Sequence, residues 1–341
     1  MATLNGQLVP IPLLVLFFFV LALPPSLACD AGDRAVLLKI KAGFLNPGIF
    51  ASWNESSATC CDWYGVGCQR LDGGRVTSLT YHNMEGAAFA LSGRLPDELG
   101  DLPFLSHLFL GNHSNIYGGL PLTLTRLTRL SALYLNRNSL SGVLPFFLSQ
   151  IPSLKVLDLA YNKFAGLIPP EFSNFPALQY LGMEVNHLEG VIPSTIGNLS
   201  KSVLPLHLNL SHNMISGDIP AELGVPNWGM LVLSHNNLTG DATPLFGANK
   251  AITYMDLSFN KLKFDMTGID FPVKLEMLAL QNNMISGSIP AQINQLGDLY
   301  TFNVSDNQLC GLIPAGPVMD RFDDTHFLRN KCLCRSKDMC L

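Results

Sequence analysis

Apolar side chains return along this chain in a unit that repeats about every 24 residues. One clean copy places leucine at positions 154, 157 and 159, then Asn162, and closes on Gly166-Leu167-Ile168-Pro169. The asparagine recurs at the same place in eight copies, at Asn138, Asn162, Asn186, Asn213, Asn236, Asn260, Asn283 and Asn307. Successive members of this series are 23 to 27 residues apart. Such regular spacing predicts a chain of stacked coils, each burying its own row of leucines.

Each copy predicts the same local structure. Its LxxLxL stretch favours a short strand whose leucines point inward, and the following glycine and proline favour a turn. The asparagine amide both donates and accepts hydrogen bonds, so it suits buried backbone groups of neighbouring coils. A fixed period in the twenties with this motif is typical of leucine-rich repeats. With two less regular copies, around Val76-Leu79-Tyr81 and Leu105-Leu108-Leu110, we expect an α/β solenoid: a curved right-handed superhelix of about ten repeats with a parallel concave sheet.

Residues between the inward leucines predict the binding surface, because side chains alternate along a strand. Tyrosines interleaved with carboxylates on an open sheet suit a large protein partner. The positions that we expect to contact a partner are Tyr134, Asp158, Gln179, Tyr180, Glu184, His207, Val232, Thr253 and Asp256. Further solvent-facing candidates on the same sheet are Asn136, Arg137, Tyr161, Asn209, His212, His235, Tyr254, Glu276 and Gln281.

The amino-terminal end predicts export and a cap. Residues 1–28 carry no charged side chain, include the apolar stretch 11–23, and end on the small-residue pattern Ser26-Leu27-Ala28. We expect a secretory signal peptide that is removed before Cys29. An uncleaved membrane anchor is the alternative, although the apolar core is short for a bilayer span. The next segment, 30–45, predicts a capping helix with one apolar stripe, formed by Val36, Leu37, Ile40 and Phe44.

The cysteines gather at the two ends of the chain: Cys29, Cys60, Cys61 and Cys68 precede the repeats, and Cys310, Cys332, Cys334 and Cys340 lie at or after the last one. An even count divided in this way predicts two disulfide-bonded caps in an oxidising compartment. Caps are needed because a terminal coil exposes a hydrophobic face. Closing the loop from Cys29 to Cys60 should stabilise the fold by roughly 3–4 kcal/mol. Zinc ligation is the alternative, but the spacings fit no standard zinc finger.

These features set the expected domain limits: a signal peptide at 1–28, an amino-terminal cap at 29–75, repeats at 76–314 and a carboxy-terminal cap at 315–341. Composition narrows the function further. Charged residues make up 14% of the chain and the formal net charge is −5. Proteins that bind nucleic acid or acidic membranes use clustered Lys and Arg, and no such run occurs in this sequence, which argues against both kinds of partner. A mild negative charge instead favours neutral or basic partners.

The sequence does not favour catalysis. Asp158 and Glu184 should lie on neighbouring coils of an open sheet, without a cleft to exclude water or shift their pKa values. His212 and His235 should be stacked, but each occurs in the same Ser-His-Asn triplet, which indicates repetition of the motif rather than a pair of metal ligands. We therefore predict that the chain is not an enzyme and holds no cofactor and no metal.

Two copies break the regular pattern. One carries extra residues near Lys201 and Ser202, with Pro205 where a leucine is expected. The copy after Asn236 ends on Gly240-Asp241-Ala242-Thr243-Pro244-Leu245-Phe246-Gly247 in place of an IP ending. Such departures predict either neutral drift or a local change in curvature.

Several motifs together carry a family resemblance. They are the repeat ending in xIP, the amino-terminal Cys60-Cys61-Asp62-Trp63 with Gly65-Val66-Gly67-Cys68, the irregular segment 240–247, and the tail from Leu309-Cys310-Gly311 to Asn330-Lys331-Cys332-Leu333-Cys334. With these motifs the whole mature chain resembles plant polygalacturonase-inhibiting proteins. The repeats alone would be shared with many plant receptor ectodomains.

The resemblance implies a secreted protein of the plant cell wall that binds endopolygalacturonases of fungi and some insects and limits pectin degradation in defence. It implies that acidic and polar residues of the concave sheet contact the active-site cleft of the enzyme, and Asp158 and Glu184 match acidic positions of that pattern. Val232 falls where related inhibitors carry an acid and Thr253 where they carry a glutamine, which puts the range of inhibited enzymes in doubt. The expected disulfides are Cys29–Cys60, Cys61–Cys68, Cys310–Cys332 and Cys334–Cys340.

Six glycosylation sequons are consistent with secretion, at Asn54, Asn112, Asn198, Asn209, Asn237 and Asn303. Asn209 and Asn303 fall at concave positions, where a glycan would obstruct part of the sheet.

Two other functions stay open. One is an extracellular signalling or developmental protein that binds a peptide or a receptor. The other is a wall protein that binds pectin itself, which the negative charge of both molecules disfavours.

Overall fold

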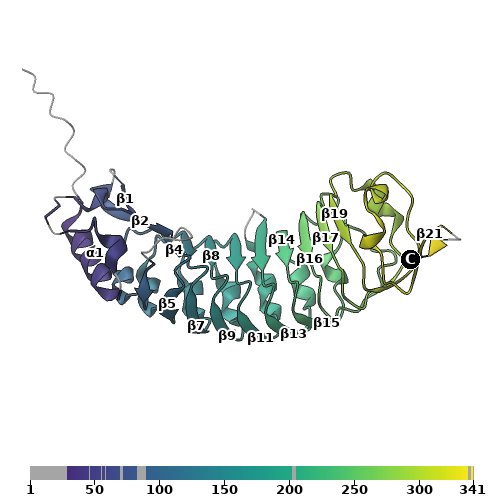
Figure 1. Ribbon diagram of the computed structural model, residues 1–341, viewed down its shortest axis with the longest axis horizontal. Coiled ribbons are helices and arrows are strands. Elements are labelled where there is room, and N and C mark those ends of the chain that lie inside the picture. The colour runs from purple at the N-terminus through teal and green to yellow at the C-terminus, as the bar shows by residue number, and fades with distance from the viewer. Residues whose placement is uncertain are drawn as a thin grey trace, which may run out of the picture.

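The protein is a curved solenoid. The computed structural model describes residues 29–45, 47–54, 56–57, 59–69, 72–82, 90–201, 205–336 and 339–340. The expected signal peptide therefore lies outside the described residues. Figure 1 shows an arc whose inner side is lined by the largest sheet, with helix α1 (Ala31–Gly43) at one end and β21 (Cys332–Ser336) at the other. Within the described ranges, no helix combines the length and the apolarity that a membrane crossing requires.

The concave sheet contains one strand from each coil. It begins with β1 (Val66–Gln69), antiparallel to β2 (Arg75–His82), and all later pairs are parallel. The remaining strands, in spatial order, are β4 (His107–Gly111), β6 (Ala132–Tyr134), β8 (Val156–Asp158), β10 (Tyr180–Gly182), β12 (Leu206–Asn209), β14 (Trp228–Val232), β16 (Tyr254–Asp256), β17 (Met277–Ala279) and β19 (Thr301–Asn303). Spatial order follows chain order, as stacked coils require. The solenoid of about ten parallel repeats is confirmed.

Most coils return through a second short strand and a 3-10 turn, and the coil of β16, all of which the structure describes, has neither. The second strands form a side sheet: β3 (Ser92–Gly93), β5 (Asn115–Gly118), β7 (Ser139–Val143), β9 (Lys163–Gly166), β11 (His187–Gly190), β13 (Met214–Asp218) and β15 (Asn237–Thr239). The 3-10 turns are η4 (Asp97–Asp101), η5 (Leu122–Arg126), η6 (Phe146–Gln150), η7 (Pro170–Asn174), η8 (Ser194–Lys201), η9 (Ala221–Gly224), η10 (Thr243–Leu245) and η11 (Ala291–Gln295). Most of them start directly after the proline of the IP motif, whose fixed φ suits a helix start.

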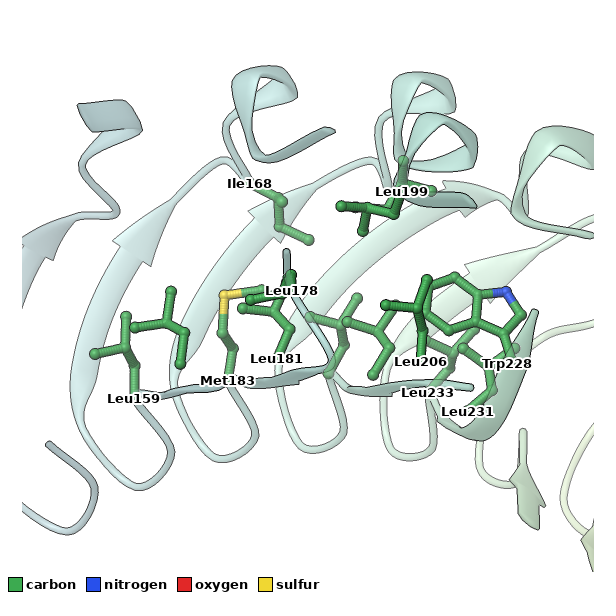
Figure 2. Packing of buried hydrophobic residues seen from close by; sticks show 14 of the residues in the cluster. Leu159, Ile168, Leu178, Leu181, Met183, Leu199, Leu206, Trp228, Leu231 and Leu233 are labelled. Atoms are coloured by element: carbon green, nitrogen blue, oxygen red, sulfur yellow. The ribbon is translucent and has the colours of Figure 1, made fainter. Parts of the chain in front are cut away.

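Buried leucines of successive coils fill the space between these layers. Figure 2 shows Leu159 and Met183 side by side along the solenoid axis and Leu233 further along the same row, each from a different coil. Trp228 occupies a position where most copies have leucine, and its indole N–H donates to the Leu223 carbonyl (2.7 Å), so the larger ring leaves no unpaired donor. Next to the long copy around residue 205, β12 pairs with β14 through a register shift between Leu206 and His207, which leaves Gly229 of β14 without a partner residue.

The repeated asparagines form a hydrogen-bonded ladder inside the solenoid. Asn162 is typical: its Oδ1 accepts from Leu140 N (3.0 Å), and its Nδ2 donates to the carbonyls of Leu135 (2.9 Å) and Leu159 (3.0 Å). Each amide therefore joins its own coil to the preceding one. The structural role predicted for these asparagines is confirmed.

The ladder is longer than the sequence pattern suggested. Asn330, inside the segment expected to be the carboxy-terminal cap, accepts from Leu309 N (3.0 Å) and donates to Val304 O (3.0 Å). At the other end His113 replaces the asparagine: its Nδ1 accepts from Leu91 N (3.1 Å) and its Nε2 lies 3.2 Å from Tyr81 O. Because Nδ1 accepts, the ring proton belongs on Nε2, which donates to the carbonyl.

The residue before each ladder position has a left-handed backbone. Arg137 (φ 56°), Tyr161 (φ 54°), Val185 (φ 53°) and His212 (φ 53°) are members of this series. This conformation costs conformational energy for every residue type except glycine. Each residue donates its backbone N–H to the next coil, for example Arg137 N to Ala160 O (2.9 Å). We call this row of side chains, at the carboxyl ends of the concave strands, the rim.

Both ends of the solenoid are capped by disulfides. Cys29 pairs with Cys60 and Cys61 with Cys68 around α1, and Cys310 pairs with Cys332 between β20 (Gln308–Leu312) and β21. The terminal sheet also contains β18 (Ser286–Gly287) and β22 (Met339–Cys340). The backbone of Cys334 lies opposite that of Cys340 in this sheet, while the Cys340 side chain is outside the described part. The zinc alternative fits poorly, because the sulfurs of Cys29, Cys60 and Cys61, which lie close together, belong to two S–S bonds.

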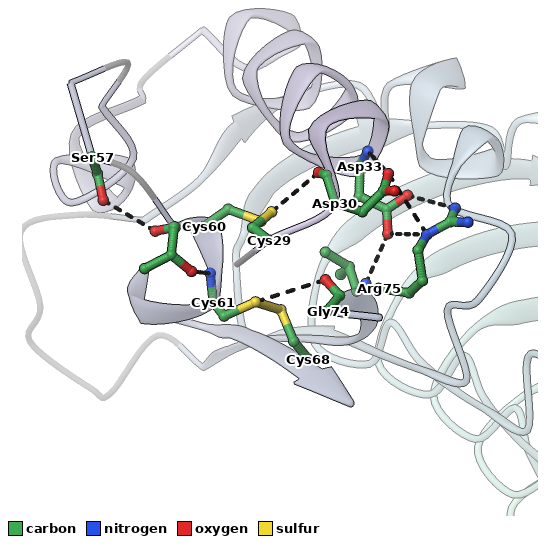
Figure 3. The surroundings of a disulfide bond; sticks show 11 residues. Cys29, Asp30, Asp33, Ser57, Cys60, Cys61, Cys68, Gly74 and Arg75 are labelled. Atoms are coloured by element: carbon green, nitrogen blue, oxygen red, sulfur yellow. Dashed lines mark hydrogen bonds and ion pairs between the residues drawn. A yellow bond between two sulfur atoms is a disulfide. The ribbon is translucent and has the colours of Figure 1, made fainter. Parts of the chain in front are cut away.

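Helix α1 closes the amino-terminal coil as expected. Asp30 caps it by accepting from Asp33 N (3.0 Å), and Leu37, Ile40 and Phe44 are buried. Figure 3 shows how the helix is joined to the first parallel strand: the buried Asp33 carboxylate accepts from the Arg75 guanidinium (2.7 and 2.9 Å) and from Val76 N (2.8 Å). These hydrogen bonds and the ion pair offset the free-energy cost of removing the Asp33 carboxylate from water.

Candidate functional site

The concave sheet brings the predicted contact residues onto one continuous surface, with differing exposure. Tyr134, Asp158, Gln179, Tyr180, Glu184, Thr253 and Asp256 are half-buried and His207 is exposed. Val232 departs from the expectation of a solvent-facing side chain, because it is only 8% exposed. The hydroxyl of Thr253 turns back to the Gly229 carbonyl (3.3 Å). These two positions therefore offer little polar chemistry to a partner.

Register places the acidic and aromatic candidates next to each other. Tyr134 and Asp158 are direct neighbours on β6 and β8, and Asp158 faces Gly182 on β10. The Tyr180 ring lies across Gly182, where an added Cβ would come within 2.7 Å of the ring. This glycine therefore leaves the space that lets the Tyr180 ring lie beside Asp158.

Burial changes the ionisation of the two carboxylates. It raises the pKa of Asp158, while the bond from Ala160 N (3.1 Å) and the charge of Arg137 oppose the shift. Burial also raises the pKa of Glu184, and the nearby charge of Asp158 raises it further. The expectation that an open sheet leaves these pKa values unshifted is wrong, because neighbouring rings remove water from the sheet surface. The same burial raises the pKa values of Tyr134 and Tyr180.

Some buried acceptors on this surface lack a hydrogen-bond partner. Among the described side chains, Glu184 Oε2 and Gln281 Oε1 are buried atoms of this kind. They occupy the same position in their coils, two residues before the ladder asparagine, where several other coils have serine. A buried acceptor without a donor costs about 1–3 kcal/mol. These two side chains are therefore incompletely satisfied in the free protein, and a donor from a partner reaches the buried oxygens only when the side chains turn outward.

Other polar side chains of the sheet are fixed by their own backbone. Asp256 Oδ1 accepts from Ser258 N (3.0 Å) and Ser258 Oγ (2.6 Å), and Asn209 accepts in the same way from Ser211 N (3.1 Å) and Ser211 Oγ (2.8 Å). Asn303 accepts from Ser305 N (2.9 Å). These bonds hold each side chain in one rotamer, so less conformational entropy is lost when a partner docks.

Aromatic residues that the sequence analysis did not single out extend the surface toward the amino terminus. Phe109 on β4 stacks on Tyr134 (ring centroids 4.6 Å apart, interplanar angle 10°), and His107 lies 6.2 Å from Phe109. Their coil is one of the two less regular copies, and His113 replaces the ladder asparagine in it. Phe109 lies four residues before His113, as Tyr134 lies four residues before Asn138, so alignment of His113 with the ladder identifies Phe109 as the equivalent of Tyr134.

Stacked side chains form the rim along the carboxyl ends of these strands. The rings of His212 and His235 are 4.1 Å apart, and His235 stacks in turn on Phe259 at 4.1 Å. The predicted histidine stack is confirmed. Burial, followed by the charge of His212, lowers the pKa of His235. Further along the rim, the Arg137 guanidinium lies 4.2 Å from the centroid of the Tyr161 ring.

The sequons occupy different faces. Asn54, Asn198 and Asn237 are exposed, in the cap, on η8 and on β15 respectively. Asn112 lies on the rim with a left-handed backbone (φ 63°). Asn209 and Asn303 end the concave strands β12 and β19, and both use Oδ1 internally, so Nδ2 is the atom left to face solvent. A glycan at either position would stand on the docking surface.

Comparisons with known proteins agree with this architecture. Residues 30–69 match a family model described as a leucine rich repeat N-terminal domain, and residues 128–188 and 206–225 match leucine rich repeat models. Polygalacturonase inhibitor 2 of Arabidopsis thaliana is 47% identical over 325 residues, covering 94% of this chain and 96% of the relative. The polygalacturonase inhibitor of Vitis vinifera is 46% identical and covers 91% of each chain. Among solved structures, a plant ice-binding protein superposes with a TM-score of 0.85 at 39% identity, over 91% of this chain and 97% of that one.

Proposed function

The chain belongs to the polygalacturonase inhibitor family of leucine-rich-repeat proteins, and we propose that it binds an endopolygalacturonase on its concave sheet and thereby limits pectin degradation. The main support for this proposal is the continuous surface formed by Tyr134, Asp158, Tyr180 and Glu184, in which partly desolvated carboxylates alternate with aromatic rings. Such a surface is suited to a folded protein, because it offers anchors without a cavity that would enclose a small substrate.

The proposed mechanism is occlusion. Strands of the concave sheet are about 4.8 Å apart, so eight coils extend over roughly 40 Å, enough for a standard interface of about 800 Å² per partner. An enzyme docked there has its cleft covered, and its polymeric substrate is excluded by contact rather than by a reaction of the inhibitor. The names of the relatives describe inhibitors, which supports a binding protein over an enzyme.

The proposal includes the setting and the partner. Residues 1–28 act as a signal peptide, the mature protein is extracellular in the plant cell wall, and the enzymes come from fungi or insects that attack that wall. Disulfides in both caps support an oxidising compartment. Asp158, Glu184 and the tyrosines are the proposed energetic centre, and Val232 and Thr253 contribute shape more than charge.

Titration of the purified protein against a panel of fungal and insect endopolygalacturonases tests this proposal. Reducing-end release from polygalacturonate should fall with increasing inhibitor and reach a plateau at a fixed stoichiometry for at least one enzyme. A parallel capture from cell-wall extract separates the rival functions: recovery of a glycoside hydrolase supports inhibition, whereas recovery of a receptor kinase supports signalling. Salt-sensitive binding to pectin beads, with no effect on any enzyme, would favour the wall-polymer function.

A further inference from the structure

Arg137 stands apart from the other cations of the concave side. It is exposed on the rim, its backbone is fixed by the bond from its N–H to Ala160 O (2.9 Å), and its guanidinium lies 4.2 Å from the centre of the Tyr161 ring. Stacking on tyrosine orients the plane of a guanidinium and leaves its N–H edge free to donate. The side chain is therefore held in place before any partner arrives.

The charges around Arg137 are opposite in sign to its own. It acts electrostatically on both Asp158 and Glu184. In the described part of the chain Arg137 nevertheless forms no ion pair within 4.0 Å, whereas Arg126 pairs with Asp101 (2.7 Å) and Arg129 with Asp72 (3.6 Å). The concave centre thus presents two carboxylates and one unpaired guanidinium within one small area.

A polygalacturonase cleft requires both signs of charge. Hydrolysis of a glycosidic bond normally uses a pair of carboxyl groups that flank the bond. Binding of polygalacturonate, a polyanion, also requires cations along the same cleft. A surface that covers such a cleft is complementary when it offers carboxylates to the cations and a guanidinium to the catalytic carboxylates.

We propose that Arg137 binds a catalytic carboxylate of the inhibited polygalacturonase, while Asp158 and Glu184 face the substrate-binding cations of the same cleft. This inference rests on the proposed inhibitory function. Arginine suits this role because its planar fork matches a carboxylate with two parallel hydrogen bonds. Lysine would keep the charge and lose the fork together with much of the stacking on Tyr161.

A double-mutant cycle tests the pairing directly. The inhibitor variants are Arg137→Ala and Arg137→Lys, and the enzyme is an endopolygalacturonase that the unchanged inhibitor binds, with and without one catalytic carboxylate converted to its amide. Affinity is measured by calorimetry or surface binding, so no activity of the enzyme is needed. Arg137→Ala should weaken binding of the unaltered enzyme by about 30-fold or more, and Arg137→Lys by an intermediate factor. Against the amide enzyme the same substitutions should change affinity by less than about threefold.

The matched control is Arg126→Ala, which removes an exposed arginine from η5, on the return side of the coil. It should leave affinity for both enzymes unchanged. Equal losses for Arg137→Ala against the unaltered and the amide enzyme, or tighter binding by Arg137→Ala, would overturn the pairing. If the unchanged protein binds no polygalacturonase, the proposed function fails first; if it binds one and Arg137→Ala has no effect, only this inference fails.

Discussion

The asparagine ladder and the concave carboxylates are polar groups of the same coils with opposite environments. Asn162 and Asp158 are four residues apart, yet the amide of Asn162 is satisfied by neighbouring backbone on both its oxygen and its nitrogen. Asp158 is partly desolvated and receives one bond from Ala160 N, and Glu184 in the next coil keeps a buried oxygen without a donor. The ladder amides find all their hydrogen-bond partners within the chain, whereas the concave carboxylates do not.

The difference indicates how one repeat serves stability and recognition together. A complete buried network stabilises the fold, and removing one member breaks several hydrogen bonds at once. An incomplete row slightly destabilises the free protein, and its partly desolvated carboxylates are suited to cations that a partner brings. The ladder should therefore respond to mutation in unfolding experiments, and the carboxylates in binding experiments.

The largest expected effect is on the ladder. Asn162→Ala breaks four hydrogen bonds and leaves Leu140 N without an acceptor, whereas the carbonyls of Leu135 and Leu159 keep their bonds from the neighbouring ladder asparagines. The free energy of unfolding should therefore fall by about 3–5 kcal/mol. Denaturant titration followed by circular dichroism measures the loss. The control is Asn237→Ala, an exposed asparagine at the start of β15, which should change stability by less than about 0.5 kcal/mol. A loss below 1 kcal/mol for Asn162→Ala would show that the ladder contributes little to the stability of the fold.

Charge reversal of the concave pair should come next in size. The double variant Asp158→Lys with Glu184→Lys should weaken polygalacturonase binding by about 100-fold, near 3 kcal/mol, because the cations of the enzyme would then meet like charge. Its unfolding transition should stay close to that of the unchanged protein. Glu171→Lys with Glu189→Lys reverses two exposed acids away from the concave sheet, on η7 and β11, and should bind normally. Unchanged binding by the concave double variant would exclude the pair from the interface.

A smaller effect is expected from pH. Burial raises the pKa values of Asp158 and Glu184 in the free protein, so both carboxylates become protonated at a higher pH than ordinary ones. Binding to cations requires the charged form, and affinity should therefore decline, by about tenfold, as pH falls through the raised pKa values. Calorimetry across a pH series measures this decline. The variant Asp158→Asn with Glu184→Gln separates it from titration of the enzyme, since its affinity should vary less steeply with pH.

The smallest effect is a gain in stability. Asp158→Asn keeps an oxygen for Ala160 N and removes a charge that folding desolvates. Because the folded-state pKa of Asp158 is raised, its charged form opposes folding above that pKa, and the penalty disappears once pH falls below the unfolded value. The variant should be more stable at pH 7 by up to about 1 kcal/mol and equal to the unchanged protein near about pH 3. Lower stability of the variant at pH 7 would contradict the assigned cause of the shift.

Much of the fold follows from spacing alone. The period fixes one coil per copy, and alternation along each strand assigns the leucines to the core, which is why the concave sheet was predictable. The ends of the ladder were not, since Asn330 follows the weak pattern Phe322, Thr325 and Phe327, and His113 differs in residue type. The spacing of Asn330 from Asn307, 23 residues, was the available signal.

The environment of the site was less predictable than its position. Asp158 of β8 lies opposite Gly182 of β10, and the Tyr180 ring occupies the space that this glycine leaves. This environment combines residues of two neighbouring coils, so no single motif encodes it. Val232 is buried although its place in the repeat predicts a solvent-facing side chain. The stacking of Arg137 on Tyr161 likewise depends on the same left-handed backbone recurring in adjacent coils.

The left-handed rim position has a consequence for how recognition changes over evolutionary time. Its backbone is imposed by bonds to the next coil, and it already accommodates side chains as different as Arg137, Tyr161, Val185 and Asp306. Substitution among them alters neither the leucine core nor the amide ladder. A lineage can therefore change this row one residue at a time while the fold stays intact, so the rim can diversify faster than the core or the ladder.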